Sequence, residues 1–92
     1  MEMNPANIAW RQIPVMTKMA VGAREASVSG EHGEILTFKV GRALTWIRVV
    51  YVAGLDTYKV ELVKGRSAKV VESHEDVYAE NLSETIYHAV CK

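Results

Sequence analysis

A chain of 92 residues with equal numbers of acidic and basic side chains is long enough for one folded domain, and we expect a single domain over residues 1–92. No apolar run reaches the ~18 residues that a membrane-spanning helix needs, and we expect no signal peptide, because no basic segment leads into an apolar one. Cys91 is the single cysteine, which excludes an internal disulfide and suits the reducing cytoplasm.

The N-terminal third of the chain predicts a helical segment. Asn4 is a favourable N-cap, and Pro5 suits the first helical position because the missing N–H of proline costs nothing there. Pro14 should end or kink this helix. Apolar residues then recur at helical spacing over residues 16–23, which predicts a second helical stretch, and residues 27–33 read as a loop.

The middle of the chain predicts β-strands. Apolar and polar residues alternate with a period of two over residues 35–40, 45–52 and 57–63, and a shorter strand covers residues 68–72. Short turns join these segments. Neighbouring strands should therefore pair antiparallel, in a four-stranded meander.

The end of the chain predicts a helix that begins at about His74. Ser73 can cap it, and Glu75 and Asp76 would then lie at the positive end of the helix dipole. We expect an α+β fold in which the N-terminal helical segment, the four-stranded antiparallel sheet and the C-terminal helix pack together, with the last helix on the sheet. The residues expected to be buried are Phe38, Val49 or Val50, Val60, Leu82 and Ile86.

The sequence offers no recognisable catalytic or metal-binding constellation. His32, His74 and His88 are far apart, and Cys91 has no second cysteine to share a metal with. No serine stands in a nucleophile elbow, and no glycine-rich phosphate loop follows a predicted strand. We therefore expect a protein that is not an enzyme and that needs neither a metal nor a cofactor.

The charges are unevenly distributed along the chain. Between residues 35 and 70 there are seven bases and two acids, whereas five acids and one base follow residue 70. Such polarity suggests surfaces for partners of opposite charge. The candidate partner-binding residues on this argument are Lys39, Arg42, Arg48, Lys59, Lys64, Arg66 and Lys69, with Trp46 as an exposed aromatic among them, and Glu80 and Glu84 on the final helix.

This polarity has two interpretations. A basic sheet face with an aromatic side chain can hold phosphates and stack a base. It can also be a solvated face whose lysines and arginines guard against aggregation, and the zero net charge favours that interpretation. Two interpretations, core or interface, also exist for Trp10, Met16 and Met19. We interpret all three as core residues.

Four short strings together resemble a known group of proteins. They are LTFKVGR at residues 36–42, DTYKVE at 56–61, VYAENL at 77–82 and, more weakly, GAR at 22–24. Their order and spacing resemble a group of small, mostly uncharacterised proteins of tailed phages and prophages, over residues 19–82. That group usually has a Gly-Gly break after its first helix, where this chain has Ile13 and Pro14.

The resemblance implies a phage or mobile-element origin and expression in the cytoplasm of a bacterial host, without a catalytic motif. Small phage proteins of this kind include many inhibitors of host defence, so we expect a protein that binds and inhibits a host machine. The sharpest form of this hypothesis is an anti-CRISPR protein that docks on an RNA-guided surveillance complex and blocks target DNA. The alternative is a small nucleic-acid-binding phage protein in recombination, packaging or regulation, and a third option is a virion or assembly component.

The implied partner is a host protein or nucleoprotein complex. Direct contact with RNA or DNA stays open at this point, and no membrane is expected.

Overall fold

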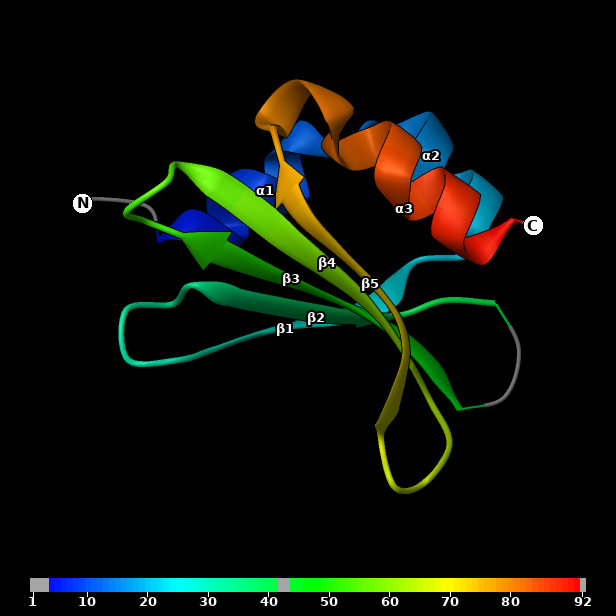
Figure 1. The fold of residues 1–92 in the computed structure, drawn as a ribbon. Coiled ribbons are helices and arrows are strands. Elements are labelled where there is room, and N and C mark those ends of the chain that lie inside the picture. Colours follow the sequence, from blue (N-terminus) through cyan, green and yellow to red (C-terminus); the bar gives the residue numbers. More distant parts are fainter. Residues whose placement is uncertain (1–3, 42–43, 92) are drawn as a thin grey trace.

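The computed structural model describes residues 4–41 and 44–91, and in them one open antiparallel sheet carries helices from both ends of the chain (Figure 1). The strands follow one another in the sheet in chain order. They are β1 (Arg24–Ser29), β2 (Ile35–Lys39), β3 (Thr45–Val52), β4 (Thr57–Lys64) and β5 (Lys69–Val77). The helices are α1 (Pro5–Gln12), α2 (Val15–Val21), the 3-10 turn η1 (Ala79–Asn81) and α3 (Leu82–Val90).

The predicted α+β class and the antiparallel meander are confirmed, but the sheet has five strands where four were predicted. The additional strand, β1, covers residues 24–29, of which the sequence assigned 27–29 to a loop and 24–26 to no element. All six of its residues are exposed, so β1 has no alternation of buried and exposed residues. Glu25, with φ at 53°, interrupts its register with β2. Backbone pairing with β2 makes this segment a strand.

The first N-terminal helix begins at the predicted cap, whereas the second ends two residues before the end of the predicted stretch. The Asn4 side chain accepts a hydrogen bond from the Asn7 N–H at 2.9 Å and so caps α1. Pro14 separates α1 from α2, because its ring is compatible with the start of a helix and not with a helix interior. Gly22 ends α2 in the left-handed conformation, with φ at 69°, which glycine adopts without strain.

The predicted start of the last helix, at about His74, is wrong. β5 continues to Val77, and α3 begins only at Leu82, after η1. Glu75 and Asp76 therefore lie in a strand and not in a first helical turn. Residues 72–77 pair with β4, and this ladder overrides a capping pattern that is favourable only locally.

All three helices cover the same face of the sheet (Figure 1). The predicted burial of core residues is confirmed, with Val49 as the buried member of its pair. Among the core residues are Phe38, Val49, Val60, Leu82 and Ile86. No helix in the part of the chain that the structure describes covers the opposite face, here called the open face.

The interpretation of the two methionines as core residues is wrong. Met16 and Met19 are 81% and 76% exposed, because the seven-residue α2 buries only Val21. Trp10 does pack against the core, with its ring centroid 5.2 Å from that of Phe38. No helix within residues 4–41 and 44–91 has both the length and the apolar character needed to span a membrane.

Candidate binding surface

Cross-strand pairs define the rows of side chains on the open face. Residues directly opposite in an antiparallel pair project to the same side of the sheet. One row joins Thr37, Arg48 and Glu61 from β2, β3 and β4. The next row joins Trp46 and Val63. The strands therefore place an aromatic, an apolar and two charged side chains side by side on a face without a helix.

Most of the cations predicted for this face have a carboxylate partner. The Arg48 Nε donates to Glu61 Oε1 at 2.7 Å, and Glu61 is 9% exposed. The Lys39 Nζ lies 3.3 Å from Glu25 Oε2, and the Lys59 Nζ lies 3.8 Å from Glu61 Oε2. The open face is accordingly less basic than the charge count along the sequence indicates.

Positive charge without such partners gathers on the hairpin that joins β4 to β5. This hairpin, here called the arm (residues 64–69), projects away from the helices (Figure 1). Lys64, Arg66 and Lys69 are exposed on it, and no ion pair joins any of them to the described residues of the chain. Arg42, the remaining base of the predicted set, lies outside the described residues.

Lys64 and Lys69 face each other directly across the arm. Like charges in this position repel each other and destabilise the sheet. Lysine ammonium groups are donors, so two lysines opposed across a hairpin can both donate to one anionic group.

A hollow of about 230 Å³ lies where the arm meets the open face. Trp46 and Val63 give it apolar walls, and Arg48 and Arg66 bring guanidinium groups to it. An indole ring beside guanidinium groups can stack a planar group and hold a phosphate. The hollow contains Trp46, Arg48 and Arg66 from the predicted set. Lys64 projects to the other face of the hairpin, where it lines a separate hollow with Leu62 and Val90, and Lys69 lies opposite Lys64. The hollow and the arm are together called the candidate binding surface, which extends over both faces of the hairpin.

The structure does not bring Glu80 and Glu84 to this surface. Glu80 belongs to η1, and Glu84 lies on α3, where its Oε1 is 3.5 Å from His88 Nε2 one turn away. Glu84, His88 and His74 line a shallow hollow of their own. No group of three or more His, Cys, Asp or Glu among the described residues is placed to hold a metal ion.

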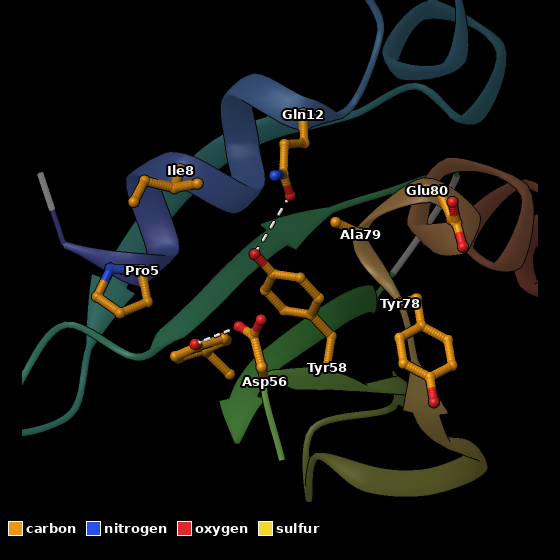
Figure 2. A pocket seen from close by; sticks show the side chains of 9 residues that line it. Pro5, Ile8, Gln12, Asp56, Tyr58, Tyr78, Ala79 and Glu80 are labelled. Carbon is orange, nitrogen blue, oxygen red and sulfur yellow. Dashed lines mark hydrogen bonds between the residues drawn. The ribbon is translucent and has the colours of Figure 1, made fainter. Parts of the chain in front are cut away.

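A larger cleft, of about 680 Å³, lies between α1 and the Tyr78–Glu80 segment (Figure 2). Two tyrosines form its floor. The Tyr58 hydroxyl donates to Gln12 Oε1 at 3.2 Å, and the Tyr51 hydroxyl donates to Asp56 Oδ1 at 2.5 Å. Sequence reasoning did not find this cleft, although Asp56, Tyr58 and Tyr78 all lie in the strings that carry the resemblance.

The two tyrosines on the floor of the cleft, Tyr51 and Tyr58, should ionise at a higher pH than an ordinary tyrosine. The hydrogen bond to Asp56 raises the pKa of Tyr51 above its usual value, and burial raises the pKa of Tyr58. Each therefore holds its proton more tightly in the folded than in the unfolded chain. The stability they contribute is fully present below about pH 10 and is lost as the pH rises through their folded-state pKa values.

We expect a titration of phenolate absorbance to extend to higher pH for the native protein than for the chain in denaturant. Tyr51→Phe should remove one of the phenols that ionise at high pH. If the high-pH part of the native titration curve were the same in Tyr51→Phe as in the parent, the assignment would be contradicted.

The lysine pair on the arm yields a stability prediction. Lys69→Glu replaces a like-charged cross-strand pair by an opposite one, so it should raise the free energy of unfolding by about 0.2–1 kcal/mol. The matched control is Lys59→Glu, which places a third carboxylate near Glu61 and Glu75 and should lower it. Urea denaturation measures both, and a Lys69→Glu variant less stable than the parent would be inconsistent with the pairing.

The fold places this chain in the α+β class, with an open five-stranded sheet covered on one face. No family model, curated protein or solved structure matches the chain, so its function is argued from its own residues.

Proposed function

We propose that this chain is a non-enzymatic protein that binds and inhibits a host machine, with the arm and the hollow as its contact surface. The observation that carries the proposal is the directly opposed Lys64 and Lys69 on an exposed hairpin. Two like charges without a carboxylate partner cost stability in the free chain. A partner that brings an anionic group to them would relieve this repulsion and gain binding energy.

A nucleoprotein complex of a bacterial host fits this surface. The lysines of the arm would reach phosphates, and the hollow with Trp46 and Arg66, on the other face of the hairpin, would take a planar group. The resemblance to proteins of tailed phages supports a host target. The sharpest form of the proposal is an anti-CRISPR protein that docks on an RNA-guided surveillance complex and blocks its target DNA, in the host cytoplasm.

A second candidate is a small nucleic-acid-binding phage protein in recombination, packaging or regulation. The juxtaposition of Trp46 with two arginines in the hollow favours it, because an indole and guanidinium groups are the side chains that stack bases and hold phosphates. The two candidates differ in what they bind. The nucleic-acid binder needs no host protein, whereas the inhibitor needs the assembled complex.

Stoichiometry tests whether inhibition depends on turnover. We expect inhibition of the host complex to rise linearly with added protein, to be complete near one protein for each binding site, and to be unchanged by a chelator. Met19→Ala, an exposed position on α2, is the matched control and should titrate like the parent. Complete inhibition at far below one protein per target would identify an enzyme and overturn the proposal.

A further inference from the structure

The cleft between α1 and η1 has the opposite electrostatic character from the arm. Nine of the described residues line it, and Asp56 and Glu80 are the charged ones among these nine. The remaining lining is aromatic, apolar or neutral: Pro5, Ile8, Gln12, Tyr51, Tyr58, Tyr78 and Ala79. A negatively charged cleft that contains three tyrosines favours a cationic group, because carboxylates and the faces of aromatic rings both attract cations.

The floor of the cleft is fixed in place before any ligand binds. The rings of Tyr51 and Tyr58 pack at 5.4 Å between centroids with a 55° tilt, and the hydrogen bonds to Asp56 and Gln12 fix their hydroxyls. Tyr58 is only 5% exposed. Preorganised groups of this kind lower the entropic cost of binding.

The walls of the cleft leave groups free to contact a ligand. Tyr78 is 54% exposed and stands at one side of the opening, with Glu80 near it, while Pro5 and Ile8 of α1 form the other side (Figure 2). The Asp56 carboxylate accepts one hydrogen bond from Tyr51 and has lone pairs for more. The cleft thus offers carboxylate acceptors, an exposed ring and an apolar wall.

We infer that this cleft binds an arginine side chain of a partner protein. A guanidinium is planar and carries several N–H groups, so it can stack on a tyrosine ring of the cleft or donate to one of its carboxylates, Asp56 or Glu80. The alkyl stem of an arginine can cover Pro5 and Ile8. Lysine offers a compact charge without a planar face, and it matches the exposed ring less well.

This inference goes beyond the proposed function, and within the part of the chain that the structure describes no residue lines both the cleft and the hollow beside the arm. The arm is proposed to bind anionic groups and the cleft a cationic one, so either proposal can be disproved without the other. A failed cleft experiment leaves the arm proposal standing, and the reverse also holds.

The test uses a short capped peptide with a single arginine, titrated into the isotopically labelled full chain and followed by backbone amide shifts. We expect shifts that saturate at Asp56, Tyr78 and Glu80. A second peptide carries citrulline, which keeps the shape of arginine and lacks its charge. It should leave the amide resonances of these three residues unchanged. The lysine peptide should bind about two- to fivefold more weakly than the arginine peptide.

Variants locate the site. Asp56→Asn keeps an acceptor for the Tyr51 hydroxyl and removes the charge, and Glu80→Gln removes the other charge; each should weaken the arginine peptide about two- to fivefold. Glu84→Gln removes a carboxylate on α3 outside the cleft and should leave the affinity for the arginine peptide unchanged. The inference would be overturned if the arginine peptide caused no amide shifts around the cleft, or if the citrulline peptide caused the same shifts. It would also be overturned if the lysine peptide bound as tightly as the arginine peptide, or if Glu84→Gln weakened binding as much as the cleft variants.

Discussion

Replacing Leu82 by alanine should lower the free energy of unfolding by about 2–5 kcal/mol. Leu82 is the first residue of α3, is fully buried and belongs to the same core cluster as Phe38 of the sheet. Its truncation removes apolar contacts and leaves a cavity that the surrounding side chains fill only in part. Urea denaturation measures the change through the midpoint of unfolding.

The matched control for Leu82→Ala is Met19→Ala. Met19 is a large apolar residue on the exposed side of α2, so its truncation should change the free energy of unfolding by about 0.5 kcal/mol or less. A loss below roughly 1 kcal/mol in Leu82→Ala would mean that α3 does not use this face to cover the sheet.

Charge reversal on the arm should have the largest effect on binding. Lys64→Glu combined with Lys69→Glu should weaken binding to the assembled host complex about 100-fold, because two attractive contacts become repulsive. The slope of log affinity against log salt should fall by about 1 for each lysine lost, since each phosphate contact releases a counterion.

The single variants allow a control that is matched in charge. Lys69→Glu alone should weaken binding about tenfold. Arg11→Glu makes the same change in net charge at an exposed position of α1 and should leave the affinity unchanged apart from weak screening effects. Equal losses in the two variants would show that only the overall charge matters.

Lys39 and Arg48 are less suitable for such a test, although the sequence suggested both. Arg48 is paired with the nearly buried Glu61, and Lys39 is paired with Glu25. Reversing either charge would set two carboxylates against each other within the fold. A loss of binding in these variants would therefore mix a change of the surface with a change of stability.

The parts of the fold that could be predicted are those whose local pattern and burial agree. β2 and β3 bury alternate side chains, β4 has an alternating sequence and is buried over most of its length, and α1 begins at the Asn4 cap. β1 and the second half of β5 could not be predicted, because edge strands expose both faces and have no apolar period. These segments are strands because their backbones hydrogen-bond to a neighbouring strand. The local sequence of a segment contains no signal of which strand will lie beside it.

The same edge strands explain why the candidate site could be predicted only in part. The sequence count placed seven bases together, but Glu25 from β1 and Glu75 from β5 reach Lys39 and Lys59 across the sheet. The cleft was missed for a related reason, since Gln12 and Tyr58, which hydrogen-bond across it, are 46 residues apart in the chain. Both features depend on tertiary pairing.

One binding measurement tests the central proposal most directly. The parent chain is titrated at physiological salt against three separate targets: the assembled RNA-guided surveillance complex, its guide RNA alone and a DNA duplex of the target sequence. We predict tight, saturable binding to the complex, a loss of that binding in the Lys64→Glu and Lys69→Glu double variant, and little binding to either naked nucleic acid. Binding to naked RNA or DNA as tight as to the complex, or no binding to the complex at all, would contradict the proposal.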